Sequence, residues 1–254
     1  MVFWIDGDNP LPRPGSVPEE VPGLVAAGGR LTPQRLEEAY RQGLFPWFGP
    51  GQPVLWWSPD PRMVLPVADF RLTRSLRKTL QRFVRTPGCE IRFDTDFRAV
   101  MQACAQAPRE GQDGTWIVPA MVDAYTEWHH AGHTHSVETW VDGECIGGLY
   151  FVTIGRMVFG ESMFSRRPDA SKLALAALVA ACRARGVDWI DCQQHTEHLA
   201  SMGAREVPRP AFEQHLSLAL GGEPIPDWSY DPAHWALLDP RLGPGDAGAA
   251  EQHA

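Results

Sequence analysis

Apolar residues recur with helical spacing along several parts of the chain. A short helix is predicted after Thr32, which can cap it, with Pro33 in its first turn and Gly43 at its end. A second runs from Thr73 to Arg85, with apolar residues at i, i+4, i+7 and i+8 that end in Val84. The same periodicity predicts helices near residues 97–104, 122–131, 170–185 and 212–220, and a short one ending near residue 203.

A strand-like pattern follows the third of the long helices. The sequence HSVETWV alternates between apolar and polar residues, and Asp142-Gly143 is a two-residue hairpin signal. The segments CIGGLYF and VFG continue as strands, and VDWIDC follows the helix that begins near Ala170 and stops at Gly186. The order of antiparallel strands, helix, strand and helix predicts an α+β fold with a central mixed sheet.

The N-terminal part of the chain lacks clear periodicity. Residues 1–30 are rich in Pro and Gly, so we expect an irregular arm that wraps a surface. The segment 45–62, FPWFGPGQPVLWWSPDPR, is predicted to be a Pro-punctuated loop. Its tryptophans fit either a binding surface or a packed wall between domains. We expect a small N-terminal domain over residues 1–62, a larger domain over 63–242, and a disordered tail over 243–254.

Composition and charge limit the class of protein. The 254 residues are 44% hydrophobic and 21% charged, as in globular proteins. No leader pattern and no run of 18 apolar residues is present, which favours a cytoplasmic protein without a membrane span. Five cysteines without CxxC spacing are typical of reduced thiols. The net charge of −8 argues against broad nonspecific nucleic-acid binding, so any nucleic-acid site must be local.

One predicted helix carries a compact basic face. Its cations lie opposite its apolar residues, and no acid interrupts them. Such a face suits a phosphate backbone, although a solvated polar face is the ordinary alternative. The cations are Arg74, Arg77, Lys78, Arg82 and Arg85.

Polar residues at predicted strand ends are the first candidates for chemistry. Glu161 leaves one predicted strand, and Asp191 and Gln193 end another, so the three are expected to converge at one sheet edge. The structural alternatives are that Glu161 pairs with Arg166 or caps a helix, and that Asp191 caps the next helix. The amide beside the two carboxylates favours a site.

Several familiar chemistries lack their motifs. The crowded histidines at 129, 130, 133 and 135 do not form HExxH, so we expect no metal. GESMFS is not a GxSxG elbow, and there is no P-loop. The turn SRRPD contains no glycine, so a nest that would cradle the pyrophosphate of a coenzyme is not expected.

A series of ordered motifs resembles the bacterial leucyl/phenylalanyl-tRNA protein transferase family. They are FPWF, WWSPDPR, TWI with AY following, HSVE, GGLY, FGESMFSR, DASK and IDCQ, and they span residues 45 to about 209. The resemblance implies a small N-terminal domain packed on a larger acetyltransferase-like (GNAT-like) domain. It also implies transfer of Leu or Phe from aminoacyl-tRNA to proteins that begin with Arg or Lys, which marks them for N-end rule degradation.

The resemblance also assigns roles to residues of this chain. Those tied to peptide transfer would be Asp191, Gln193 and Glu161, with IDCQ selecting Gln193 over its neighbour Gln194. Those holding the aminoacyl adenosine would be Trp47, Trp116 and Phe159, with Tyr125 and Ser165 as weaker candidates. The amino-acid pocket would be lined by Leu149, Met163, Leu175, Leu178 and Ile190. The acceptor stem of the tRNA would meet Arg74, Lys78 and Arg82.

The chemistry of this reaction agrees with the missing motifs. An aminoacyl ester is already activated, so no ATP, metal or other cofactor is expected. An N-terminal amine has a pKa near 8, so a useful fraction is free base at neutral pH. Orienting amine and ester can then supply most of the acceleration. Gln193 could donate to the oxyanion or accept the amine proton with Asp191 polarising its amide, and Glu161 or Asp191 could attract the cationic side chain of the acceptor.

The sequence also departs from the family pattern and leaves rivals open. Phe151 stands where glycine is expected, and Leu178 and Cys182 stand where larger aromatics occur, so the pocket is expected to be reshaped. Leucine, phenylalanine and methionine should all pass, because one methylene discriminates weakly. The rivals are a coenzyme A-dependent N-acyltransferase, a noncatalytic RNA-binding module and a peptidase adaptor. We expect the chain to act as a monomer.

Overall fold

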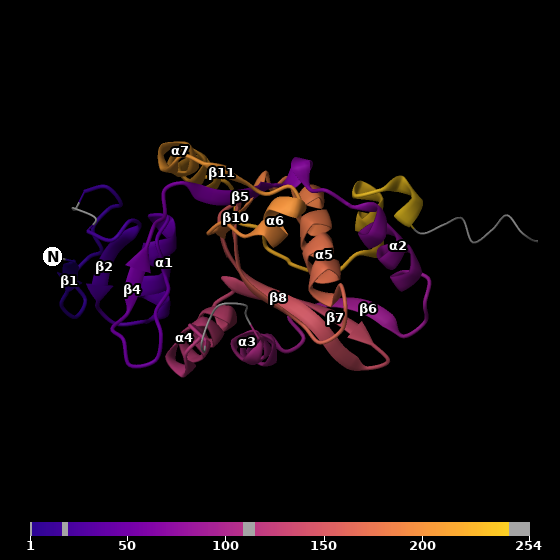
Figure 1. Cartoon of the computed structure of the whole chain (residues 1–254), viewed down its shortest axis with the longest axis horizontal. Helices are drawn as coiled ribbons and strands as arrows, with labels where there is room; N and C mark the ends of the chain where they lie inside the picture. The colour runs from indigo at the N-terminus through magenta and orange to yellow at the C-terminus, as the bar shows by residue number, and fades with distance from the viewer. Residues whose placement is uncertain (1, 17–19, 109–114, 244–254) are drawn as a thin grey trace, which may run out of the picture.

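The computed structural model describes residues 2–16, 20–108 and 115–243. Most of the expected disordered tail, residues 244–254, lies outside the described residues. The structure contains two sheets, a small one built from the N-terminal part and a large mixed one built from the rest (Figure 1). The expected α+β class, with a small N-terminal sheet beside a larger mixed sheet, is confirmed. Among the described residues, no helix combines the length and the apolar character needed to cross a bilayer.

The small sheet has the strand order β1-β2-β4-β3, and β1 runs parallel to β2. Helix α1 (Pro33–Arg41) lies next to it, capped by the Thr32 hydroxyl as predicted, and Gly43 follows in the left-handed region at φ 73°. The strands are β1 (Phe3–Ile5), β2 (Leu24–Gly28), β3 (Phe45–Pro46) and β4 (Leu55–Trp57).

Two expectations for the N-terminal part are wrong. The arm is not irregular throughout, because β1 pairs with β2 and all five residues of β2 are buried. The aromatic loop is not strand-free either, because β3 and β4 lie within it and pair with each other. Strands of two to five residues give too few alternations for periodicity to detect, and the flanking Pro and Gly conceal them.

The large sheet has the strand order β11-β5-β10-β9-β8-β7-β6. Its neighbours are antiparallel except β9 and β10, which run parallel. The predicted hairpin is confirmed, with Asp142 and Gly143 both at positive φ between β7 and β8. The strands are β5 (Arg62–Pro66), β6 (Cys89–Phe93), β7 (Thr134–Val141), β8 (Glu144–Ile154), β9 (Met157–Ser165), β10 (Trp189–Gln193) and β11 (Arg205–Val207).

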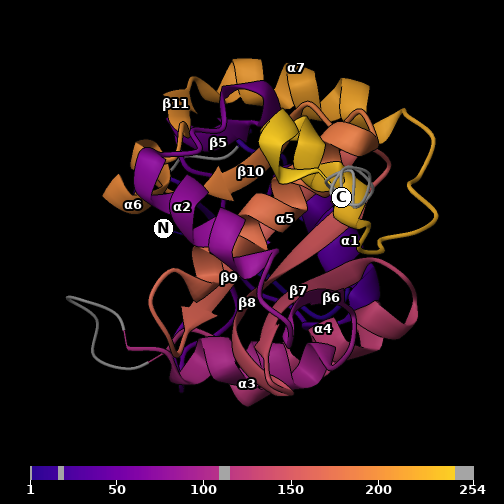
Figure 2. The same ribbon diagram turned by 90° about the vertical axis from the view of Figure 1, so that its right-hand side faces the viewer.

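Helices cover both faces of the large sheet (Figures 1 and 2). Helices α3 (Phe97–Gln106) and α4 (Pro119–His130) pack on one face, in a core that continues into the small sheet. Helices α5 (Ala170–Ala184) and α2 (Arg74–Phe83) pack on the other face. The remaining elements are α6 (Glu197–Ser201), α7 (Arg209–Leu220) and the 3-10 turns η1 (Val67–Asp69), η2 (Pro232–Leu237) and η3 (Pro240–Leu242).

The end of α2 differs from the predicted pattern. Leu76, Leu80 and Phe83 are buried as expected, but the helix ends at Phe83 and Val84 is 36% exposed. Val84 was expected on the apolar face, yet it forms the C-cap just after the last helical residue.

The expected domain boundary at residue 62 lies near the join of the two sheets. The last strand of the small sheet ends at residue 57, and the first strand of the large sheet begins at residue 62. The boundary itself stays a prediction.

Candidate active site

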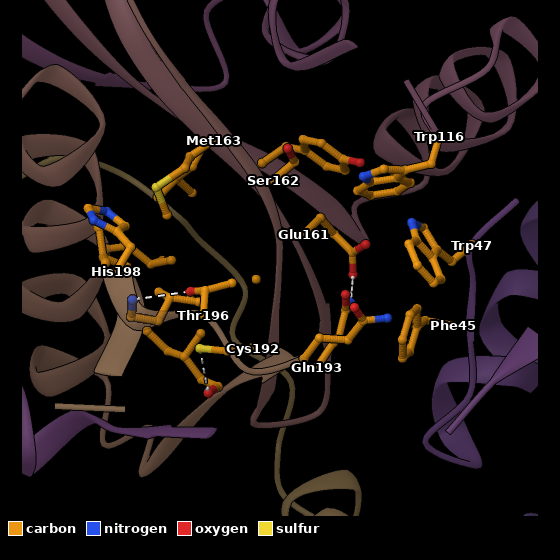
Figure 3. A pocket seen from close by; sticks show the side chains of 18 residues that line it. Phe45, Trp47, Trp116, Glu161, Ser162, Met163, Cys192, Gln193, Thr196 and His198 are labelled. Carbon is orange, nitrogen blue, oxygen red and sulfur yellow. Dashed lines mark hydrogen bonds between the residues drawn. The ribbon is translucent and has the colours of Figure 1, made fainter. Parts of the chain in front are cut away.

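A cavity of about 350 Å³ opens where β9 and β10 diverge. The two strands pair at Ile190 with Val158 and at Asp191 with Phe159, and the cavity-lining residues of both strands begin here and continue beyond. Figure 3 shows Glu161 and Gln193 in the middle of the cavity wall, between an aromatic side and a largely apolar side. Its volume falls within the roughly 300–1,000 Å³ of small-molecule sites. The cavity is therefore large enough for an amino-acid side chain and part of a nucleoside.

One side of the cavity is largely apolar. Side chains from β8, β9, β10 and α5 form it, and Cys192 and Leu199 extend it. Thr196 and His198 add polar groups at this side (Figure 3). All five residues predicted to form an amino-acid pocket line this one cavity, although that role stays a prediction. They are Leu149, Met163, Leu175, Leu178 and Ile190.

The opposite side is aromatic. Phe45 and Trp47 come from β3 and the residue after it, and Trp116 comes from the segment before α4. Trp47 is held from behind by Trp57, whose ring nitrogen donates to the Trp47 carbonyl at 2.7 Å and whose ring meets it edge-on at 5.4 Å. Flat aromatic walls of this kind suit stacking on a base. The predicted adenosine residues Trp47 and Trp116 thus share one wall.

A β-bulge places Glu161 at the cavity. In the β8–β9 ladder Tyr150 pairs with Ser162 and Phe151 pairs with Gly160, so Glu161 is the extra residue. Bulges re-aim a side chain and are frequent beside active sites. Glu161 therefore lies in the middle of β9, and the expectation that it leaves the strand is wrong.

A second irregularity places Gln193. In the β5–β10 ladder Asp191 pairs with Val64 and Gln193 pairs with Met63, so Cys192 is the extra residue. Gln193 itself adopts a left-handed conformation at φ 63°, which is uncommon for a residue other than glycine. Such a conformation persists only where its surroundings fix it. The two bulges face one another across the gap between β9 and β10.

The Glu161 carboxylate is the centre of a hydrogen-bond chain. Tyr40 donates to Glu161 Oε1 at 2.6 Å, and Gln193 Nε2 donates to the same oxygen at 2.8 Å. The Tyr40 and Tyr125 hydroxyls are 2.6 Å apart, so Tyr125 donates to Tyr40. The pKa of Glu161 is raised to about 8, with burial as the largest cause; the bond from Tyr40 opposes the rise, the charge of Asp191 adds to it, and the bond from Gln193 and the charge of Arg62 oppose it. Glu161 is therefore largely protonated at neutral pH.

Asp191 has a cationic partner that the sequence analysis missed. Arg62 Nε and Nη2 donate to the two Asp191 oxygens at 2.9 and 2.7 Å, and both side chains are fully buried. Asp191 Oδ1 also accepts the backbone N–H of Gln193 at 2.9 Å. The alternative of a helix cap is wrong for Asp191, because its oxygens are used here. Glu161 likewise does not pair with Arg166, which instead donates to a backbone carbonyl.

Three predicted adenosine residues lie away from the cavity surface. Phe159 is fully buried and packs edge-on against Tyr40 at 4.9 Å. Tyr125 is fully buried behind Tyr40. Ser165 is exposed at the end of β9, where its hydroxyl accepts the Ser171 N–H at the start of α5. Phe159 and Tyr125 therefore support the cavity wall from behind, and none of the three lines the cavity as the structure describes it.

Sequence reasoning missed Tyr40 and Arg62, which are buried behind the cavity, as well as lining residues such as Phe45, Thr196 and His198. Tyr40 was visible only as part of the apolar face of a helix, and its hydroxyl gave no separate signal. Arg62 precedes the buried strand residues MVLP, where a lone cation fits a loop end as well as a core. The only sign of a buried role for Arg62 would have been its ion pair with Asp191, which lies 129 residues away in the sequence and is recognised only in the folded structure.

Most of the predicted basic face is exposed, on α2 and, for Arg85, just after its end. Arg77 is the exception, because its Nε forms an ion pair with Asp239 at 2.8 Å. Thr79 on the same helix bonds Asp169, the residue before α5, which places the face beside the helix that lines the cavity. The exposed cations are Arg74, Lys78, Arg82 and Arg85.

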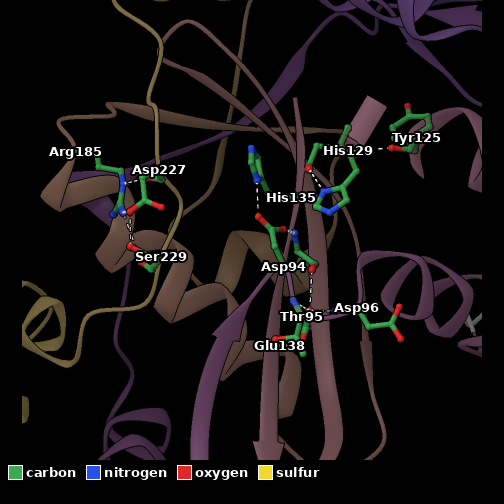
Figure 4. Close-up of polar contacts among 12 residues, drawn as sticks. Asp94, Thr95, Asp96, Tyr125, His129, His135, Glu138, Arg185, Asp227 and Ser229 are labelled. Carbon is green, nitrogen blue, oxygen red and sulfur yellow. Dashed lines mark hydrogen bonds and ion pairs between the residues drawn. The ribbon is translucent and has the colours of Figure 1, made fainter. Parts of the chain in front are cut away.

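Two of the crowded histidines, His129 and His135, belong to a separate cluster with Asp94 (Figure 4). Ligand-type atoms of Asp94, His129 and His135 lie within 4.8 Å of one another. Asp94 bonds His135 Nδ1 and the Ser136 N–H, each at 2.7 Å, and His129 Nδ1 bonds the Thr134 carbonyl at 2.6 Å. These bonds connect β7 with α4 and with the residue that follows β6, so they give the cluster a structural role.

Two of the residues at which the sequence departs from the family pattern do not line the cavity. Phe151 is buried and packs against Trp228 of the C-terminal segment at 4.9 Å, and Cys182 is buried within α5. Leu178 does line the cavity. A reshaped pocket would therefore depend directly on Leu178, with Phe151 acting only through the packing around it.

Comparisons with known proteins identify the family of the chain. The family model described as leucyl/phenylalanyl-tRNA protein transferase matches residues 64–217, and that of its N-terminal domain matches residues 29–60. Both descriptions define a transferase, and together they cover more than half of the chain. The chain therefore belongs to the leucyl/phenylalanyl-tRNA protein transferase family.

Curated relatives resemble the chain over nearly its whole length. The leucyl/phenylalanyl-tRNA protein transferase of Methylibium petroleiphilum is 61% identical, over 98% of this chain and 96% of its own. That of Leptothrix cholodnii is 59% identical, over 96% and 98%, and that of Burkholderia pseudomallei is 55% identical, over 91% of each. The membership favours a transferase over the coenzyme A-dependent, RNA-binding and adaptor alternatives.

Solved structures show more distant likenesses. A GCN5-related N-acetyltransferase from Kribbella flavida is 11% identical, with a TM-score of 0.35 over 67% of this chain and 59% of its own. L-PGS from Bacillus licheniformis is 10% identical, with a TM-score of 0.39 over 69% and 55%. Neither likeness is close enough to argue from.

Proposed function

We propose that this transferase moves leucine, phenylalanine or methionine from aminoacyl-tRNA to the N-terminus of proteins that begin with Arg or Lys. The observation that carries the proposal is the meeting of three features in one cavity. An apolar side, an aromatic wall and the Glu161–Gln193 pair adjoin one another there. An aminoacyl adenosine has the matching parts, which are an apolar side chain, a base and a reactive ester between them.

The donor end of the tRNA would lie across the cavity. Its terminal base would stack on the wall of Trp47 and Trp116, and its amino-acid side chain would enter the side formed by Leu178 and its neighbours. The ester would then lie between the two sides, next to Glu161 and Gln193. The exposed cations of α2 would meet phosphates of the acceptor stem, which makes the nucleic-acid contact local in a chain of net charge −8.

The reaction joins the acceptor amine to the ester carbonyl. A C–N bond forms, the C–O bond to the ribose breaks, and one proton passes from the amine to the ribose oxygen. Because Gln193 Nε2 donates to Glu161, the amide oxygen of Gln193 is turned away from that carboxylate. We assign that oxygen to the amine, whose N–H it would accept while the amine attacks. Most of the acceleration then comes from orientation.

The two carboxylates would have different roles. Glu161 is largely protonated, so it would give its proton to the departing ribose oxygen and take the amine proton in return; its pKa of about 8 lies near the ordinary pKa of an α-amine, which keeps this exchange low in free energy. Asp191 is neutralised by Arg62 and holds the backbone of Gln193, so its role is to fix position. Neither offers an unpaired charge to the cationic side chain of the acceptor. The net negative charge of the chain would favour that cation at longer range.

The cellular setting follows from the substrates. Aminoacyl-tRNA is a cytoplasmic donor, so the protein would work in the cytoplasm. A new N-terminal Leu or Phe would mark the acceptor for N-end rule degradation. We expect the protein to work as a monomer.

Transfer of radiolabelled leucine from Leu-tRNA tests the proposal. A peptide that begins with Arg should become labelled, without ATP or coenzyme A, and the same peptide beginning with Ala should not. Acetyl-coenzyme A in place of the charged tRNA should give no acylated product. Equal labelling of both peptides would contradict the acceptor rule, and an unlabelled Arg peptide with intact charged tRNA would contradict the transfer itself.

A further inference from the structure

Arg62 joins two parts of the site that come from different sheets. The residue begins β5 of the large sheet and its side chain is fully buried. Nε and Nη2 donate to Asp191 on β10, and Nη1 donates to the Gly43 carbonyl at 3.0 Å, in the turn that connects α1 to β3. The guanidinium also lies over the rings of Phe45, at 5.0 Å, and Phe212, at 4.5 Å.

The Gly43 contact controls the aromatic wall. From Gly43 the chain continues to Phe45 and Trp47, both of which line the cavity. Phe45 lies between the guanidinium and the cavity, so it is in contact with both. Gly43 has a positive φ of 73°, and a Cβ at this position would lie 2.9 Å from a ring atom of Phe212. The turn is thus packed closely against Phe212, the ring over which the Arg62 guanidinium also lies.

The Asp191 contact controls the transfer residue. Asp191 Oδ1 accepts both Arg62 Nε and the backbone N–H of Gln193. That N–H belongs to the residue with the left-handed backbone, at a bulge of β10. A buried carboxylate that lost its cation would not keep this position, because an uncompensated buried charge is strongly unfavourable.

We propose that Arg62 is a positioning residue for the transfer reaction. By bonding Gly43 and Asp191 at once, its side chain holds the aromatic wall and the Gln193 amide at a fixed separation. The inference rests on the proposed function, because it assigns the wall to the adenosine and the amide to the attacking amine. It adds a residue that touches neither substrate. Its effect reaches the reaction through Phe45 and Trp47 on one side and through Asp191 and Gln193 on the other.

Only the geometry of arginine meets this requirement. Its planar group presents several N–H donors in a fixed fork, and here three of them bond three oxygens of two residues, Asp191 on β10 and Gly43 in the turn after α1. A lysine at the same position would keep the charge beside Asp191, but all its donors would come from a single nitrogen, which cannot match the fork of the guanidinium. Arg62→Lys therefore separates the positioning role from simple charge neutralisation.

The test compares Arg62→Lys with wild type in Leu transfer to the Arg peptide. We expect kcat to fall about ten- to hundredfold, since small misplacements of reacting groups cost up to this much. Binding of a nonhydrolysable leucyl-adenosine amide should weaken as well, while binding of uncharged tRNA through α2 should stay within twofold. Val64→Ala is the matched control, because Val64 is buried on the same strand and pairs with Asp191 in register. It should lower the unfolding temperature without lowering kcat.

The outcomes separate this inference from the proposed function. If wild type transfers leucine but Arg62→Lys and Val64→Ala lower kcat alike at equal loss of stability, Arg62 has only a structural role. If wild type does not transfer, the proposed function fails, and the adenosine-amide affinities of the two variants still decide whether Arg62 holds the wall. Should Arg62→Lys not fold, Phe212→Leu replaces it, because it removes one ring beside the guanidinium and leaves the ion pair. A kcat no lower than that of Val64→Ala would overturn the proposal.

Discussion

Gln193 Nε2 donates to Glu161 Oε1 at 2.8 Å, although the two residues stand on strands that have already diverged. Each lies at or beside a bulge, and Tyr40 bonds the same carboxylate oxygen at 2.6 Å. The pair thus bridges the gap in which the cavity lies. Side chains fixed by the sheet itself, rather than by loops, provide the preorganisation that catalysis by orientation needs.

A shorter side chain at position 193 tests the contact with Glu161 without disturbing the left-handed backbone conformation. Asn tolerates the left-handed conformation better than most residues, so Gln193→Asn should fold as well as wild type. It would no longer reach Glu161, and we expect kcat to fall about ten- to hundredfold. Binding of aminoacyl-tRNA, measured by filter retention, should change less than threefold.

The neighbouring glutamine provides a matched control for this change. Gln194 also lines the cavity, but in the described contacts the bond to Glu161 comes from Gln193. Gln194→Asn should therefore keep most of the wild-type kcat. Equal losses of turnover in the two variants, or parallel losses of turnover and tRNA binding in Gln193→Asn, would refute a role for Gln193 in the reaction step.

Glu161 should make the stability of the protein depend on pH. Its pKa in the folded protein is about 8, against an ordinary value of 4.5. A raised pKa means that the folded state binds the proton more tightly, so stability is full below about pH 4.5 and is lost as the pH rises through 8. The loss should be on the order of 3 kcal/mol, which is less than the full shift would give, because Glu161 is only partly buried and borders the cavity.

Glu161→Gln isolates this contribution. The amide keeps the size of the side chain but does not titrate, so its free energy of unfolding should fall less than that of wild type between pH 5 and 8.5. Chemical denaturation at several pH values measures the difference. Parallel curves for the two proteins would show that Glu161 is ionised over the whole range, and the proton exchange with the amine would then lose its basis.

The sequence predicts elements that carry their own local signals. The helix after Thr32 has a cap, a first-turn proline and a glycine stop, and the hairpin at Asp142 has the required dipeptide. Long periodic helices such as α5 were also predicted, and all five pocket candidates line one cavity. These features depend on near neighbours, or on motifs that keep their spacing.

Features that depend on distant partners were not predictable. The bulge at Glu161 depends on its pairing with β8, and no residue type demands it. The ion pair of Arg62 and Asp191 joins residues 129 positions apart. Tyr125 was a weaker candidate that came only from the family resemblance, whereas its burial behind Tyr40 depends on how α1 packs on α4. Short buried strands such as β2 likewise depend on pairing.

The exposed cations of α2 should account for part of the tRNA affinity. Arg74, Lys78 and Arg82 changed together to Ala should weaken binding and lower the slope of log K against log salt by about 2 to 3, since each phosphate contact contributes roughly 0.7 to 0.9. Binding measured between 50 and 300 mM salt gives the slope. Turnover at saturating aminoacyl-tRNA should be unchanged, because none of the three lines the cavity.

A second triple variant controls for net charge. Arg41, Arg98 and Arg205 are cations of the described surface, and each is already paired with an acid. Changing them to Ala removes the same charge elsewhere, so the salt dependence should remain that of wild type. If both triples lower the slope equally, the effect is one of overall charge and the α2 face has no special role.

Leu178 should set the choice between donors. It lines the apolar side of the cavity from α5, so Leu178→Phe would fill space that a phenylalanyl donor needs. We expect kcat/KM for Phe-tRNA to fall about tenfold more than for Leu-tRNA, within the roughly 1–3 kcal/mol that pocket fit provides. Competition between the two charged tRNAs measures the ratio. Cys182 lies one turn further along α5 and does not line the cavity, so Cys182→Val should leave this ratio unchanged. An equal shift of the ratio in both variants would show that the donor side chain does not bind beside Leu178.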